Sequence, residues 1–101
     1  MRVKNMTSSR GNSIPNQFIM EDEGRGALGN FIRRETFQSY DSVIVVKTIW
    51  KDKTKIELDE NKWDYSNTTN KYRNQFLGET KKETLAKIKS GEYTLTNLNR
   101  D

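Results

Sequence analysis

The stretch from Trp63 to Gly78 constrains the fold of this chain more than any other, because it contains a helix with both of its end signals. Ser66 or Asn67 offers a side-chain oxygen to the free backbone N–H groups of a first helical turn. Tyr72 and Phe76 are four residues apart and fall on one face of that helix. The closing glycine tolerates the left-handed conformation in which many helices end. The stretch therefore predicts an amphipathic helix that packs on a small core.

A second helix is predicted directly after the first. Thr80 and Glu83 have the spacing of a capping box, in which each side chain satisfies a free backbone N–H group of the first turn. Leu85 and Ile88 form the inner edge of this helix, which ends before Gly91. Both predicted helices thus lie in the C-terminal part of the chain.

Strand signals dominate the remainder. Val43 to Trp50 is β-branched almost throughout and apolar in its first half, which predicts a central strand covered on both faces. After a short turn, Thr54 to Asp59 alternates between apolar and polar residues, which indicates a half-exposed antiparallel partner. The glycine-rich residues 22–30 predict a flexible connection. Shorter candidate strands are Gln17 to Glu21, Thr36 to Tyr40 and Tyr93 to Leu95.

We therefore predict one α+β domain over residues 17–101, with an antiparallel sheet of about four strands and two C-terminal helices packed on it. Residues 1–16 are polar and predict a flexible N-terminal arm. A chain of 101 residues fits this single-domain organisation. The predicted core consists of Phe18, Phe37, Val43, Val45, Ile56, Leu58, Trp63, Tyr72, Phe76, Leu85 and Ile88.

The composition excludes several kinds of chemistry. The chain has no cysteine and no histidine, which excludes disulfides, thiolate nucleophiles and a Ser-His-Asp triad. It also lacks a phosphate-binding P-loop and a dinucleotide fingerprint. Asp59, Glu60 and Asp64 carry oxygen ligands of the kind that Mg²⁺ prefers, but turns and helix caps explain acids at these positions equally well. We expect a protein that is not an enzyme and that uses no cofactor and no metal.

The net charge of +4 and the isoelectric point of about 9.4 make the surface basic, with the excess concentrated between Lys71 and Lys89. A basic surface suits nucleic acid or an acidic protein face, and the alternative is a solvated surface that maintains solubility. Ser8 to Asn12 could form a backbone nest for phosphate, or a mobile polar arm. Tyr40, Trp50 and Trp63 are available to stack on bases. The candidate contact residues for a partner or nucleic acid are Arg33, Arg34, Lys71, Arg73, Lys82 and Lys89.

Three groups of segments carry a resemblance to known sequences. They are residues 7–12 with 15–18, residues 36–42, and residues 63–66 continuing through 71–78 to 83–84 and 90–91. In these segments the chain resembles a family of small, uncharacterised proteins encoded by phages, prophages and plasmids of Gram-positive bacteria. The family is a domain of unknown function, so the resemblance implies a biological context and no site residues. The stretch from Gly24 to Arg34 is longer here than the family leads us to expect.

This resemblance implies a function by binding, because small phage and plasmid proteins without catalytic residues are often inhibitors of host defence, including anti-CRISPR proteins. We expect a stoichiometric inhibitor of a bacterial defence nuclease, which binds a CRISPR effector or competes with its guide RNA or DNA. The alternatives are a basic nucleic-acid-binding accessory protein of a phage or plasmid, and a virion or assembly component. The expected location is the cytoplasm of the bacterial host, because the absence of cysteine fits a reducing compartment. The longest apolar run, Val43 to Val46, is far too short to span a membrane.

Overall fold

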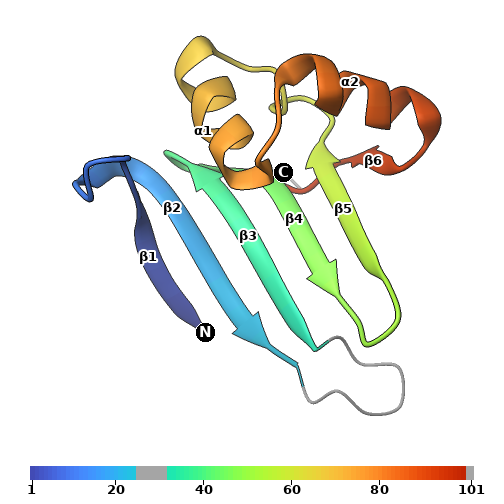
Figure 1. Cartoon of the computed structure of the whole chain (residues 1–101), viewed down its shortest axis with the longest axis horizontal. Coiled ribbons are helices and arrows are strands. Elements are labelled where there is room, and N and C mark those ends of the chain that lie inside the picture. The colour runs from blue at the N-terminus through green and yellow to red at the C-terminus, as the bar shows by residue number, and fades with distance from the viewer. Residues whose placement is uncertain (25–31, 100–101) are drawn as a thin grey trace.

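The protein is a two-layer α+β structure, seen in a computed structural model that describes residues 1–24 and 32–99 (Figure 1). The sheet of the described residues has six strands in the order β1-β2-β3-β4-β5-β6. The predicted α+β class and the two C-terminal helices are confirmed, whereas about four strands was too few. The elements are β1 (Arg2–Thr7), β2 (Ser13–Glu23), β3 (Arg33–Ser39), β4 (Ser42–Ile49), β5 (Thr54–Asp59), α1 (Asn67–Leu77), α2 (Lys81–Ser90) and β6 (Tyr93–Thr96).

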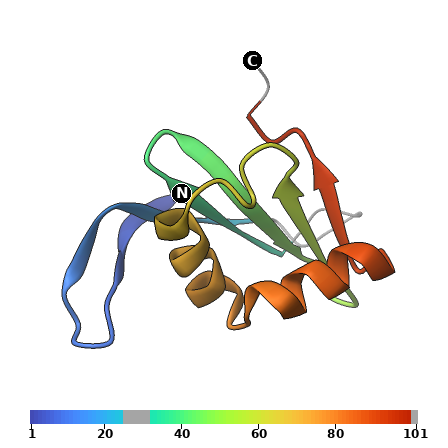
Figure 2. The same cartoon turned by 90° about the horizontal axis from the view of Figure 1, so that it is seen from above.

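The sheet is antiparallel from β1 to β5, and β6 runs parallel to β5. A parallel neighbour requires a crossover connection, and α1 and α2 provide it between β5 and β6. Both helices lie on the same face of the sheet (Figure 2). In the described part of the chain, the opposite face carries no helix.

The predicted ends of both helices are confirmed. The side chain of Ser66 accepts a hydrogen bond from the backbone N–H of Thr69 at the start of α1, and Gly78 ends α1 with φ 70°. Both bonds of the predicted capping box between Thr80 and Glu83 are present at the start of α2. Local sequence therefore determines where each helix begins and ends.

Phe37, Val45 and Leu58 lie at the centre of the core with no exposed surface. The ring of Phe37 stacks on that of Phe76 from α1, with centroids 5.8 Å apart. The predicted core residues that pack against this centre are Ile56, Trp63, Tyr72, Phe76 and Ile88. The buried core also contains Met6, Ile14, Ile44 and Tyr93, which the sequence analysis did not include.

The predicted central position of β4 is confirmed, but its two faces are not covered evenly. Val45 faces the helices and is fully buried, whereas Val46 on the helix-free face is only half-buried. Phe18 and Val43 are likewise half-buried rather than core residues, and so is Leu85 on α2. Thr48, on the same face as Val46, is only 3% exposed, so the helix-free face of β4 is covered at Thr48 and partly open at Val46.

Residues 1–16, for which the sequence predicted a flexible arm, form an edge strand, a turn and the start of β2. Met6 is 3% exposed, and the side-chain amide of Asn5 donates to the carbonyl of Ile14 at 2.8 Å. The predicted connection over 22–30 is shortened because β2 continues to Glu23, and residues 25–31 lie outside the described part. Of the described helices, neither has the length and apolar character needed to cross a membrane.

Candidate binding surface

The structure distributes the predicted basic contact residues over several surfaces. Arg33 faces a hollow beside α1, whereas Arg34 points to the opposite face of the sheet, where its Nε lies 3.4 Å from Oγ1 of Thr48. Lys71 is exposed on α1, and Lys82 and Lys89 are exposed on α2. These residues therefore do not form one patch.

Arg73 was predicted to be an exposed contact residue, and the structure contradicts this because the side chain is fully buried. Its guanidinium donates to the carbonyl of Trp63 and, at 2.9 Å, to the side-chain oxygens of Asn70 and Asn74. It also lies 5.3 Å from the centre of the Trp63 ring. Burial lowers the pKa of Arg73, and this effect is larger than that of the nearby charges of Asp64 and Glu79, which raise it. Arg73 is thus a structural residue that joins α1 to the preceding connection.

The predicted phosphate nest at Ser8 to Asn12 is filled by a side chain of the same turn. Oγ of Ser8 accepts hydrogen bonds from the backbone N–H groups of Arg10, at 3.3 Å, and Asn12, at 3.2 Å. An anion at this position would compete with that hydroxyl, so the turn is not a preformed nest.

The acids considered as magnesium ligands have structural roles. Asp59 is 1% exposed and accepts backbone hydrogen bonds from Asn61 at 3.1 Å and Leu98 at 2.8 Å, which fixes the C-terminal segment beside β5. Asp64 pairs with Lys81 at 2.9 Å. Within residues 1–24 and 32–99, no group of three or more potential metal ligands is found.

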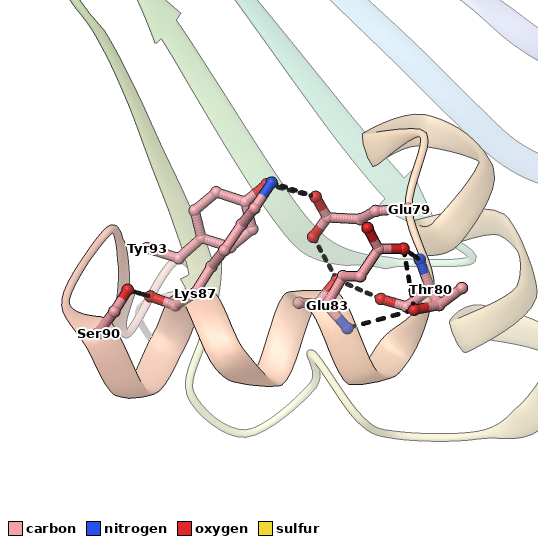
Figure 3. A network of polar contacts seen from close by, with 7 residues as sticks. Glu79, Thr80, Glu83, Lys87, Ser90 and Tyr93 are labelled. Carbon is pink, nitrogen blue, oxygen red and sulfur yellow. Dashed lines mark hydrogen bonds and ion pairs between the residues drawn. The ribbon is translucent and has the colours of Figure 1, made fainter.

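Glu79 is the centre of a buried polar network between the helices and β6 (Figure 3). It accepts hydrogen bonds from Thr84 Oγ1 at 2.5 Å, Lys87 Nζ at 2.9 Å and the Tyr93 hydroxyl at 2.8 Å. Burial raises the pKa of Glu79, but the hydrogen bonds from Lys87, Thr84 and Tyr93 outweigh this effect and lower it overall. Burial and the bond to Glu79 raise the pKa of Tyr93 to about 12. The network stabilises the ionised carboxylate and holds α2 on the sheet.

One hollow, of about 460 Å³, lies at the far end of β2 and adjoins a second of about 220 Å³ beside α1. Both are lined by Glu21 and Arg33. Glu21 is 8% exposed and pairs with Lys4 at 3.2 Å and with Arg33, which also pairs with Glu35 at 2.8 Å. The hydrogen bond from Lys4 lowers the pKa of Glu21. Because these charges neutralise one another, the hollow offers little net charge to a ligand.

A third hollow, of about 280 Å³, has a different lining and is the best candidate for a contact site. It lies between the turn from β3 to β4 and the connection from β5 to α1. Two exposed tyrosines lie on it, Tyr40 with 55% and Tyr65 with 62% of its surface exposed. We call it the tyrosine hollow, and its lining residues are Ser39, Tyr40, Asp41, Ser42, Ile44, Lys62, Tyr65 and Thr69.

The backbone holds Tyr40 in an uncommon conformation. Its φ is 55°, in the left-handed region that bulky residues rarely adopt. Its N–H donates to the carbonyl of Asn16 at 2.7 Å, and Asn16 itself has φ 63°. Its carbonyl accepts from the side-chain amide of Gln38 at 2.8 Å. A left-handed conformation costs an ordinary residue about 1–2 kcal/mol, so the position of this exposed ring comes at the expense of local stability.

Tyr65 lies under a cation. Nζ of Lys62 is 4.1 Å from the centre of the Tyr65 ring, and Lys62 forms no ion pair among the described residues. The hydroxyls of both tyrosines also lack a hydrogen-bond partner in the described part of the chain. Deeper in the hollow, the buried hydroxyls of Ser39 and Thr69 hydrogen-bond to each other at 3.0 Å. The tyrosine hollow thus combines aromatic rings, a lysine and polar groups in its buried part.

Sequence reasoning identified part of this site. Tyr40 was among the predicted stacking residues and is exposed, whereas Trp63 is packed against Arg73. Tyr65 and Lys62 were missed. Tyr65 lies two residues after Trp63 in the same connection, and nothing local distinguishes the exposed ring from the packed one.

Comparison with known proteins places this chain in a sequence family. The profile of DUF8033, a family of unknown function, matches residues 1–92. This range contains β1 to β5 and both helices and ends one residue before β6. No curated protein and no solved structure matches the chain.

Proposed function

Since the chain belongs to the DUF8033 family, which has no assigned function, we propose one from its surface. The protein is a non-enzymatic binding protein of a mobile genetic element and a stoichiometric inhibitor of a bacterial defence nuclease, such as a CRISPR effector. It acts by binding the effector or by competing with its nucleic acid. The tyrosine hollow is the centre of the contact surface.

One observation carries this proposal: Tyr40 and Tyr65 are both exposed and line the same hollow. Tyrosine is enriched among the few residues that dominate binding energy, because it buries a large rigid surface and also offers a hydroxyl. The strained backbone of Tyr40 supports a role in binding, since such strain is concentrated at functional sites.

The carboxylates give no support to a catalytic alternative. Those of Glu21, Glu79 and Asp59 are buried and accept hydrogen bonds from groups of the same chain. The pKa values of Glu21 and Glu79 are lowered. A general acid at neutral pH requires the opposite shift.

The test is a cleavage titration. Purified CRISPR effectors of several types are loaded with guide RNA, before or after addition of the protein, and target cleavage is measured against the molar ratio of protein to effector. We expect complete inhibition near one equivalent for the susceptible effector. The double variant Tyr40→Asn/Tyr65→Ala should lose this inhibition, whereas Lys51→Ala, which changes an exposed residue in the turn between β4 and β5, should retain it. No inhibition of any effector, or equal inhibition by the double variant, contradicts the proposal.

A second candidate, a nucleic-acid-binding accessory protein, is favoured by the lysines of the helical layer. Lys71, Lys82 and Lys89 are exposed and form no ion pair among the described residues. Cations of this kind bind phosphate backbones regardless of sequence. Removing all three should weaken duplex binding in a gel shift at low salt and reduce its salt dependence. Unchanged binding of the triple variant excludes this role for the helical layer.

A further inference from the structure

We infer that the tyrosine hollow binds an unpaired base of a single-stranded nucleic acid, with Lys62 contacting a neighbouring phosphate. This inference rests on the proposed binding function and names the ligand class of that same site. It has its own readout, because it is tested without any nuclease.

The size of the hollow suits one planar group. Its volume of about 280 Å³ lies just below the range of about 300–1,000 Å³ that is typical of sites for larger small molecules. A hollow of this size holds one ring system and leaves the rest of a polymer outside. The ligand is therefore a single group presented by a longer chain.

The lining suits a base. Exposed tyrosine rings are stacking surfaces for unpaired bases in single strands, and stacking accepts every base because each has a flat π-face. The hydroxyls of Ser39, Ser42 and Thr69 lie in the same hollow. The bond between Ser39 and Thr69 leaves one of their two O–H groups as a donor, and the oxygen of Ser42, which donates to Asp41, can still accept a hydrogen bond from the edge of a base. A duplex keeps its bases paired and stacked, so it cannot present one to this hollow.

Lys62 supplies the charge for the backbone. A cation–π contact at an exposed site is worth only about 0.5–1 kcal/mol, so Nζ can leave the Tyr65 ring for a phosphate at small cost. Lys62 is the cation among the residues that line the hollow, and Asp41 is the carboxylate. Asp41 is exposed on the turn, where its Oδ1 accepts a hydrogen bond from Oγ of Ser42 at 3.3 Å. The +4 charge of the whole chain adds a general attraction for a polyanion.

The experiment measures fluorescence anisotropy of labelled oligothymidylate and oligouridylate of about eight nucleotides, a length within the usual site size. A duplex of the same length serves as comparison. We expect binding of at least one single strand at low salt and several-fold weaker binding of the duplex. Tyr40→Asn and Tyr65→Ala should each weaken single-strand binding about tenfold, whereas Tyr40→Phe and Tyr65→Phe should retain it. If the phenylalanine variants retain binding and no variant loses thermal stability, the weaker binding of Tyr40→Asn and Tyr65→Ala results from lost stacking and not from misfolding.

A matched pair of lysine variants tests the phosphate contact. Lys62→Ala and Lys51→Ala remove the same charge from the chain, but only Lys62 lines the hollow, whereas Lys51 is exposed in the turn between β4 and β5. Lys62→Ala should weaken binding several-fold and reduce the salt slope by about 0.7, whereas Lys51→Ala should change neither. Equal effects of the two variants overturn the assignment of Lys62.

The base-binding inference is overturned if neither oligonucleotide binds at low salt, if the duplex binds as tightly as the single strands, or if the tyrosine variants bind unchanged. Its failure differs from failure of the proposed function. Inhibition that depends on the tyrosines without oligonucleotide binding means that the hollow receives a protein side chain instead. If oligonucleotide binding depends on the tyrosines but no effector is inhibited, the base-binding inference stands and the proposed inhibitor function is contradicted.

Discussion

The hydroxyl of Tyr93 on β6 donates a hydrogen bond to Oε1 of Glu79, in the connection between α1 and α2, at 2.8 Å. This bond connects the parallel last strand to the crossover that precedes it (Figure 3). A four-residue edge strand has few backbone bonds of its own. Its attachment therefore depends on side chains such as this pair.

Tyr93→Phe should lower the free energy of unfolding by about 2 kcal/mol, because it removes a hydrogen bond to a buried charged group and retains the ring. Tyr72→Phe is the matched control, since the Tyr72 hydroxyl has no partner among the described residues, and it should change stability by less than about 0.5 kcal/mol. Urea unfolding of the two variants measures the difference. Equal stability of both variants contradicts the role assigned to the Tyr93 hydroxyl.

The unfolding free energy should fall in acid because Glu79 is ionised in the folded state. Its folded pKa lies below the ordinary value of 4.5, so its contribution is complete above about pH 4.5 and is lost as the pH falls through the folded pKa. Glu79→Gln should be less stable than the wild type at pH 7 and should lose less stability between pH 7 and pH 3. Chemical denaturation across this range measures both slopes. Glu92→Gln removes an exposed carboxylate, and its stability should depend on pH as that of the wild type does. If the stability of Glu79→Gln shows the same pH dependence as the wild type, the Glu79 network is not the cause of the acid destabilisation.

Arg73→Lys should lower the unfolding free energy by about 2–3 kcal/mol, although it conserves the charge. Lysine cannot reproduce the planar fork that reaches Trp63, Asn70 and Asn74, and buried acceptors would lose their donors. Lys71→Ala removes an exposed cation from the same helix and should have little effect on stability. Thermal unfolding of the two variants decides the matter, and a stable Arg73→Lys protein would show that the guanidinium fork is dispensable.

Tyr40→Asn should preserve stability or raise it by up to about 1 kcal/mol, because asparagine adopts the left-handed conformation more readily than tyrosine. The same variant should lose binding. Tyr65→Ala, at a position without positive φ, should change stability by less than about 0.5 kcal/mol. Calorimetry measures the stability of both. A marked loss of stability in Tyr40→Asn would mean that the ring serves the fold rather than a partner.

The helices could be predicted from sequence because their signals are local. Ser66, Gly78, Thr80 and Glu83 act within one turn of their own position. Ser66 was one of two predicted caps, and the other three were assigned correctly. The hairpin of β4 and β5 was also predicted, since its alternation and short turn are contiguous in the chain. Local signals thus gave the elements around the centre of the sheet.

The remaining features depend on contacts between distant residues. β1 is a polar strand, and its position depends on β2 and α1. Met6 of β1 is buried, and the side-chain amide of Gln75 on α1 donates a hydrogen bond to the carbonyl of Thr7. Arg73 was taken for a surface residue. One of its hydrogen-bond acceptors is the backbone carbonyl of Trp63, and the sequence does not reveal that this carbonyl faces the helix. The tyrosine hollow joins residues 39–44 to residues 62–69, and no spacing rule brings these segments together.

The cleavage titration with the double variant Tyr40→Asn/Tyr65→Ala tests the central claim most directly. The account predicts that the wild-type protein stops target cleavage by a susceptible effector near one equivalent, and that the equally stable double variant does not. Inhibition by the double variant at the same molar ratio, or no inhibition of any effector by the wild type, would contradict it.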